Sequence, residues 1–276
     1  MQPTRFTSIG LFGTGVMAKG VAALCLSNGL DVVLQSNAPE RAGALRQELL
    51  HASPGASIST GPAALERCQL LLEATVEDLA VKREALSRLE PYLPADAFLA
   101  TTTSSLSITE LAAALRKPER MVGVHFFNPV HRMPLVEIVA GVRTSPEAVE
   151  AGRTLAHALG KRPLRVPDRA GFLVNRLLIP YLNQAVRLTE SGYASPADID
   201  LAITLGAQHP LGPFALIDLI GADVCEAISA SLFDEFHRPY DAAPPELKQR
   251  VRSGMLGRKT GHGYYDYPAK PKKPSG

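Results

Sequence analysis

The chain has 276 residues, of which 46% are hydrophobic and 20% are charged, proportions that are typical of a soluble globular protein. Its 29 basic and 27 acidic residues leave a formal net charge of +2, too balanced for a nucleic-acid-binding or membrane-surface protein. The scattered cysteines Cys25, Cys68 and Cys225 predict neither a disulfide framework nor a metal site. No signal peptide and no apolar run of about 20 residues is evident, so we expect a cytoplasmic protein with no membrane span.

Short β-type runs alternate with helical segments over the first 167 residues. Strands are expected at residues 6–12, 31–34, 70–72, 98–101, 121–127, 135–139 and 161–166. Helices are expected between them at residues 16–28, 39–51, 79–89, 108–115 and 146–159. This alternation predicts right-handed βαβ units and a mostly parallel, doubly wound sheet with helices on both faces.

The pattern changes near Pro167 and Asp168. Helices are expected at 170–192, 195–204 and 214–236, with no convincing strand between them. We therefore predict an α/β protein in two domains, an N-terminal doubly wound domain (1–167) and an all-helical domain (168–276). Long apolar segments in the helical domain favour a homodimer, although packing against the first domain is the alternative.

A glycine loop, Gly13-x-Gly15-x-x-Ala18, lies between the first strand and the first helix. The first glycine permits a tight turn, the second lets the backbone approach a pyrophosphate, and Ala18 permits close helix packing. The backbone at Val16 and Met17 opens the helix, where N–H groups favour an anion. In this context the loop predicts a Rossmann-type nicotinamide dinucleotide site and hence an oxidoreductase, whereas an ordinary glycine turn is the alternative.

The residue after the second strand is Ser36, where an acid would bind the ribose 2′-hydroxyl of NAD. Without a carboxylate, a 2′-phosphate is not repelled, Ser36 and Asn37 are able to donate to it, and Arg41 is able to pair with it. Arg41 as an ordinary solvated helix residue is the alternative. Both NAD and NADP therefore stay open as cofactors, with a slight preference for NADP.

A histidine and a glutamate lie on consecutive predicted strands. His125 ends the run MVGVHFFNP, and Glu137 lies in LVEIV. A carboxylate bonded to an imidazole fixes its tautomer and raises its basicity, which suits a general base. From the residues alone, a buried structural histidine and a surface glutamate remain alternatives.

At this point the sequence resembles the 3-hydroxyacyl-CoA dehydrogenase family over nearly its whole length. The motifs that carry the resemblance are GTGVMAKGVA (13–22), VEDLAVK (76–82), TTTSSLSITELA (101–112), GVHFFNPV (123–130), LVEIV (135–139), GFLVNRLLIPYLNQA (171–185), LGPF (211–214) and GRKTGHGYYDY (257–267).

The resemblance implies a reversible hydride transfer between a 3-hydroxyacyl thioester and NAD(P), with a short acyl chain of the 3-hydroxybutyryl type, as in fatty acid metabolism. It assigns the catalytic base to His125, its orienting carboxylate to Glu137, and contacts with the substrate oxygen to Ser104 and Asn175. The cofactor contacts that the resemblance implies are Glu77, Lys82, Thr102, Ser104 and Asn128. For Glu77 and Lys82, a capping or surface role is the alternative.

The chain departs from the family pattern in three places. Ser36 replaces an aspartate, and Thr102 replaces an asparagine near the nicotinamide. The segment between residues 35 and 77 is short and has no lysine or arginine between Arg46 and Arg67, so the usual clamp for CoA phosphates is missing. Lys259 is one candidate phosphate contact.

The missing clamp keeps other substrates open. Two other substrates could undergo the same reaction in place of an acyl-CoA. One is an acyl group bound to an acyl carrier protein, which brings its own docking surface, and the other is a free hydroxy acid. A non-catalytic protein built on this fold is a further alternative, which the intact set of His125, Glu137, Ser104 and Asn175 disfavours.

Overall fold

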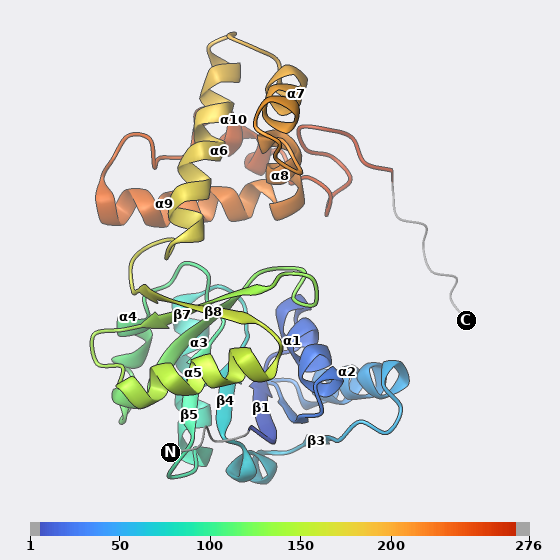
Figure 1. Ribbon diagram of the computed structural model, residues 1–276, viewed down its shortest axis with the longest axis vertical. Helices are drawn as coiled ribbons and strands as arrows, with labels where there is room; N and C mark the ends of the chain where they lie inside the picture. Colours follow the sequence, from blue (N-terminus) through green and yellow to red (C-terminus); the bar gives the residue numbers. More distant parts are fainter. Residues whose placement is uncertain (1–5, 269–276) are drawn as a thin grey trace. The chain divides into compact units, whose positions relative to one another are not determined.

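The computed structural model describes residues 6–268, which form two compact units (Figure 1). The first unit ends at Phe172 and the second begins at Leu173. This division falls a few residues beyond the predicted boundary because Asp168 is bonded into the first unit. Its carboxylate accepts hydrogen bonds from the backbone N–H groups of Ile108, at 2.9 Å, and Thr109, at 2.7 Å.

The first unit is built on an eight-stranded sheet in the order β3-β2-β1-β4-β5-β6-β7-β8. The strands are β1 (Ser8–Phe12), β2 (Asp31–Gln35), β3 (Ile58–Thr60), β4 (Leu70–Glu73), β5 (Phe98–Thr101), β6 (Met121–Phe126), β7 (Leu135–Ala140) and β8 (Arg162–Pro167). All neighbouring pairs are parallel except β6 and β7, which are antiparallel. The mostly parallel sheet is thus confirmed, and β3 is the strand that the sequence did not predict. Its three residues are too few to show an alternating pattern.

Helices cover both faces of the sheet, as the doubly wound prediction requires. They are α1 (Val16–Ser27), α2 (Pro39–Ala52), α3 (Leu79–Leu89), α4 (Ile108–Ala112) and α5 (Pro146–Ala158), with short 3-10 helices at Pro62–Arg67, Glu90–Tyr92 and Pro118–Arg120. Leu70 and Leu72 of β4 pack in the core that α1, α2 and α5 close, whereas Leu71 packs in the core of α3 and α4. This alternation follows from the two-residue repeat of a strand that is buried on both faces.

The second unit is helical, as predicted. Its helices are α6 (Val174–Glu190), α7 (Pro196–Gly206), α8 (Pro213–Ile220), α9 (Ala222–Phe236) and α10 (Pro245–Arg252). The single helix predicted over 214–236 is wrong, because Gly221 adopts φ +108° and divides it into α8 and α9. Helix α10 was not predicted, since its polar sequence buries only Leu247. None of the helices within residues 6–268 is long and apolar enough to cross a membrane.

Candidate active site

The parallel strands β1, β2, β4, β5 and β6 all end at the same edge of the sheet. The chain builds outward from β1 to β2 and β3, then returns to the other side of β1 with β4, so the strand order reverses between β1 and β4. Open α/β sheets bind ligands in the crevice at such a reversal, outside the carboxyl ends of the strands. The predicted site residues of the first unit follow these strand ends.

The two glycines of the loop after β1 meet different constraints. Gly13 has φ +136°, and a Cβ atom built there would lie 2.3 Å from the carbonyl oxygen of Ala74. Gly15 is the N-cap of α1, where no side chain caps the helix. Apart from its chain neighbours, no atom of residues 6–268 lies within 4 Å of a Cβ built on it. The protein therefore needs a glycine at position 13 for its own packing, whereas the space at Gly15 suits a pyrophosphate at a helix N-terminus.

A cavity of about 940 Å³ opens beside this loop. Its lining includes the predicted cofactor residues Gly13, Gly15, Val16, Met17, Ser36, Asn37 and Arg41. Lys19, which the sequence analysis did not select, also lines the cavity, but its ammonium is paired with Glu48. Arg41 is exposed and forms no ion pair with another residue in the part of the chain that the structure describes.

Hydrogen-bond donors dominate the part of the cavity after β2. The Ser36 hydroxyl oxygen accepts from the N–H of Ala38 at 3.2 Å, which leaves its own proton to donate. The Asn37 carboxamide oxygen accepts from the Arg88 guanidinium at 2.6 Å. Since that oxygen is engaged, the Asn37 amino group is the part available to a ligand. Arg88, on α3 and far away in sequence, gave no signal that could have linked it to this site.

His125 and Glu137 form a buried pair on β6 and β7. They lie directly opposite each other in the antiparallel register, and 2.8 Å separates His125 Nδ1 from Glu137 Oε2. Their side chains are 6% and 0% exposed. A carboxylate accepts hydrogen bonds, so Nδ1 carries the proton and Nε2 presents its lone pair. The centroid of the imidazole lies 4.6 Å from that of the Phe127 ring and 5.5 Å from that of the Phe172 ring, so two apolar rings pack near it.

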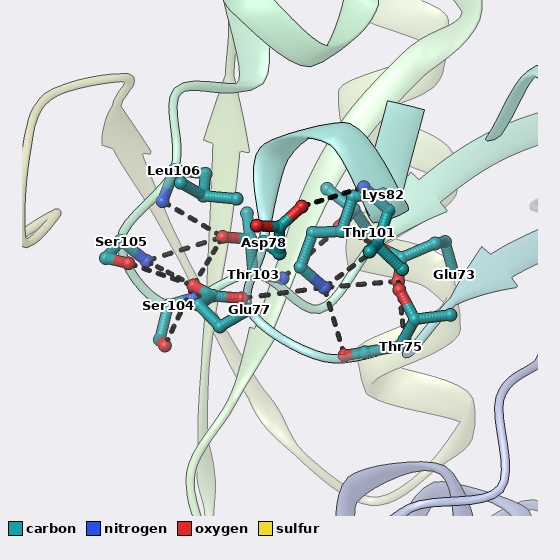
Figure 2. A network of polar contacts seen from close by, with 11 residues as sticks. Glu73, Thr75, Glu77, Asp78, Lys82, Thr101, Thr103, Ser104, Ser105 and Leu106 are labelled. Carbon is teal, nitrogen blue, oxygen red and sulfur yellow. Dashed lines mark hydrogen bonds and ion pairs between the residues drawn. The ribbon is translucent and has the colours of Figure 1, made fainter. Parts of the chain in front are cut away.

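Glu77 holds the loop after β5 (Figure 2). Its Oε1 atom accepts from the Thr103 hydroxyl at 2.7 Å and from the backbone N–H groups of Ser104 at 2.7 Å and Ser105 at 2.9 Å. Burial disfavours the Glu77 carboxylate, but the Lys82 ammonium and these hydrogen bonds outweigh burial, so its pKa lies below the ordinary value. The Ser104 hydroxyl makes the longest of these contacts, at 3.2 Å.

Lys82 lies beneath this loop, with its side chain only 1% exposed. Its ammonium is 3.1 Å from both carboxylate oxygens of Glu73 and 3.5 Å from Glu77 Oε2 (Figure 2). Sequence reasoning missed Glu73, which ends β4 and is fully buried. The available signal for Glu73 was its position as an acidic residue at the end of the otherwise apolar run LLLE.

The remaining predicted residues lie in separate places. Thr102 is buried and donates its N–H to the carbonyl of Glu73, whereas Asn128 is exposed in the loop after β6. Asn175 lies in the first turn of α6 in the helical unit, and its contact with substrate stays a prediction. The ammonium of Lys259 is bound to both carboxylate oxygens of Asp223, so the structure gives it a different partner from the substrate phosphate considered above.

The glycine loop at a strand-order reversal makes the first unit a dinucleotide-binding domain of the Rossmann type. A family model described as the 3-hydroxyacyl-CoA dehydrogenase NAD binding domain matches residues 51–169, and one described as the C-terminal domain of that enzyme matches residues 171–267. The first match begins after the glycine loop, so the loop is independent support for the dinucleotide site.

Similar proteins cover nearly the whole chain. A 3-hydroxybutyryl-CoA dehydrogenase of Mycobacterium tuberculosis is 38% identical over 94% of this chain and 98% of its own length. One from Clostridioides difficile is 39% identical over 94% of this chain and 99% of its own length. The crystal structure of M. tuberculosis FadB2 is similar with a TM-score of 0.89 and 36% identity, covering 95% of this chain and 99% of that one. The chain belongs to the 3-hydroxyacyl-CoA dehydrogenase family.

Proposed function

We propose that the protein interconverts a 3-hydroxyacyl-CoA and the corresponding 3-oxoacyl-CoA by hydride transfer to or from a nicotinamide dinucleotide. The observation that carries this proposal is the buried pair of His125 and Glu137, 2.8 Å apart at the edge of the sheet where the dinucleotide cavity opens. The names of the relatives support the substrate class, since several are 3-hydroxybutyryl-CoA dehydrogenases.

In the oxidative direction, His125 Nε2 takes the proton of the C3 hydroxyl, and Glu137 stabilises the imidazolium that forms. In the reductive direction, the imidazolium returns this proton to the forming alkoxide. The nicotinamide ring, when bound, accepts or supplies the hydride. The apolar rings of Phe127 and Phe172 lower the dielectric around the imidazole, which strengthens its interaction with the carboxylate.

We assign Ser104 as a hydrogen-bond donor to the developing charge on the substrate oxygen. For Asn175, a contact with that oxygen rests on the family resemblance alone. A serine hydroxyl has one proton, so Ser104 must turn from Glu77 to donate to substrate. Its 3.2 Å contact is the longest that Glu77 Oε1 makes with the loop, and the backbone bonds hold the loop while the hydroxyl turns. Thr102 and Asn128 are assigned to the nicotinamide side of the site.

The proposed substrate is tested by measuring kcat/KM for each combination of a cofactor and an acyl substrate. Acetoacetyl-CoA should be reduced with NADH or NADPH, and the same acyl group on an acyl carrier protein should be a poorer substrate by kcat/KM. The names of the relatives include 3-hydroxybutyryl-CoA and 3-hydroxyadipyl-CoA dehydrogenases, so longer and carboxylated acyl-CoA substrates belong among those tested. Turnover of the carrier-bound or free acid alone would contradict the proposal.

We propose NADP as the preferred cofactor because Ser36, Asn37 and Arg41 line the cavity as donors and a cation, and no carboxylate stands directly after β2. The carboxylate of Glu48, which also lines the cavity, is paired with Lys19. Ser36→Asp should reverse this preference, because a carboxylate repels a 2′-phosphate and accepts from a ribose hydroxyl. We expect the ratio of the NADPH and NADH dissociation constants to change by at least about tenfold, or about 1.4 kcal/mol.

Gln47→Glu is the matched control, since it adds the same charge on an exposed position of α2 outside the cavity lining. It should leave both dissociation constants, measured by fluorescence titration, unchanged. A wild-type protein that binds NADH far more tightly than NADPH would overturn the NADP proposal.

The helical unit supports a homodimer. Leu201 and Leu205, one turn apart on α7, are 57% and 74% exposed, and Leu177 on α6 is 70% exposed. Apolar side chains on neighbouring turns are characteristic of a surface that another chain covers. We also propose a cytoplasmic location, which the free thiols of Cys25, Cys68 and Cys225 support.

A further inference from the structure

We infer that Glu73, with its charge balanced by Lys82, is a positioning residue for the two loops that border the dinucleotide crevice. This inference rests on the proposed function, because it concerns the same crevice. Glu73 is the last residue of β4 and pairs in register with Phe12 of β1 and Thr101 of β5. Its carboxylate therefore lies at the reversal of strand order, next to the place where a cofactor pyrophosphate is expected.

The bonds of Lys82 show that its ammonium is fully engaged inside the protein. An ammonium has three N–H donors. Three acceptor groups surround it: the Glu73 carboxylate at 3.1 Å, the Thr75 carbonyl at 3.4 Å and the Glu77 carboxylate at 3.5 Å. With these acceptors around it and only 1% of the side chain exposed, the Lys82 ammonium is bound to the protein itself in this structure.

Glu73 joins several segments at once (Figure 2). One carboxylate oxygen accepts from the backbone N–H and the hydroxyl of Thr75, and the other accepts from the Thr101 hydroxyl at 2.6 Å. Lys82 extends this network from Glu73 to Glu77, which binds the loop that carries Ser104. The loop after β4 and the loop after β5 are thus held by one buried carboxylate and its counter-ion.

The charges of this network explain why the ion pair matters for an anionic ligand. The Glu73 side chain is fully buried, so an unpaired carboxylate there would lose hydration and act on the crevice through a low dielectric. Lys82 cancels that charge. Removing Lys82 leaves a buried anion that repels the cofactor phosphates and takes the ammonium away from Glu77. Removing both charges abolishes the repulsion, although Glu77 still lacks its ammonium.

Second-site rescue tests the inference. Cofactor dissociation constants are measured by NADH and NADPH fluorescence, and kcat by acetoacetyl-CoA reduction, on full-length variants at a temperature well below their melting points. Lys82→Met should weaken cofactor binding by more than tenfold. Adding Glu73→Gln keeps a carboxamide oxygen for Thr75 and places an amino group against the Thr101 hydroxyl oxygen. It should restore part of the affinity and of kcat, because breaking a buried ion pair is far worse than replacing both partners.

Arg83→Met is the matched control, since Arg83 is the next residue of α3 and its ion pair with Glu110 is exposed. It should leave affinity and kcat unchanged. A Glu73→Gln/Lys82→Met protein that binds cofactor as weakly as Lys82→Met would overturn the inference and assign Lys82 to the cofactor itself. Wild-type affinity in Lys82→Met would also overturn it.

The double variant also decides the question if Lys82→Met does not fold. A folded double variant that binds cofactor supports the inference, and one that does not fold or does not bind overturns it. Titration of the wild-type protein with each cofactor distinguishes failure of the proposed function from failure of the positioning role. If the wild-type protein binds neither cofactor, the proposed function fails, whereas wild-type binding without rescue contradicts only the positioning role.

Discussion

His125→Gln should reduce kcat for acetoacetyl-CoA reduction by about a thousandfold, because the variant has no group that can gain and lose a proton at this position. The glutamine side chain is able to keep a hydrogen bond to Glu137, so the fold should survive. Steady-state kinetics at saturating cofactor measure the effect, and the melting temperature and cofactor dissociation constant should stay near wild type.

Glu137→Gln provides the comparison within the pair. It keeps a hydrogen-bonding group beside the imidazole but removes the charge that stabilises the imidazolium, so kcat should fall substantially but less than in His125→Gln. Near-normal turnover in His125→Gln would remove this histidine from the mechanism.

Gly13→Ala and Gly15→Ala should fail in different ways although both change the same loop. The Cβ at position 13 meets the carbonyl of Ala74 at 2.3 Å and the backbone has φ +136°, so Gly13→Ala should destabilise the fold itself. We expect about 3 kcal/mol of lost stability from the strained backbone and the overpacking. The melting temperature should fall by about 5–10 °C.

Gly15→Ala should instead leave the melting temperature of the cofactor-free protein near wild type. No described atom beyond its chain neighbours lies within 4 Å of the new Cβ, and φ is −75°. Its cost should appear as weaker cofactor binding, because the methyl group occupies the space where the backbone approaches the pyrophosphate. Thermal unfolding with and without cofactor separates the two effects. Equal melting temperatures for both variants, or unchanged cofactor affinity in Gly15→Ala, would contradict this division of roles.

The sequence predicted the elements of the first unit well because strands buried on both faces have distinctive apolar runs. The strands that it predicted are all present, and the pairing of His125 with Glu137 followed from their places on consecutive strands. It failed where the signal was weak or non-local. Three residues of β3 carry no periodicity, and the break between α8 and α9 depends on the backbone of Gly221.

Site residues were hardest to predict where a partner is far away in sequence. Arg88 reaches Asn37 from α3, and Glu73 reaches Lys82 and Thr101 from the end of β4. These contacts depend on which strands become neighbours, which no local pattern encodes. Glu77 and Lys82 were selected from the family motif as cofactor contacts, and the structure adds that both also bind other parts of the protein.

The direct opposition of His125 and Glu137 across β6 and β7 has a consequence for how such an enzyme can diversify. A backbone ladder aligns the two residues, so the proton-handling pair does not depend on the conformation of the connecting segment. The exposed part of that segment, residues 131–134, can accept substitutions over evolutionary time while the pair keeps its geometry. New acyl specificities can thus arise on an unchanged acid–base centre.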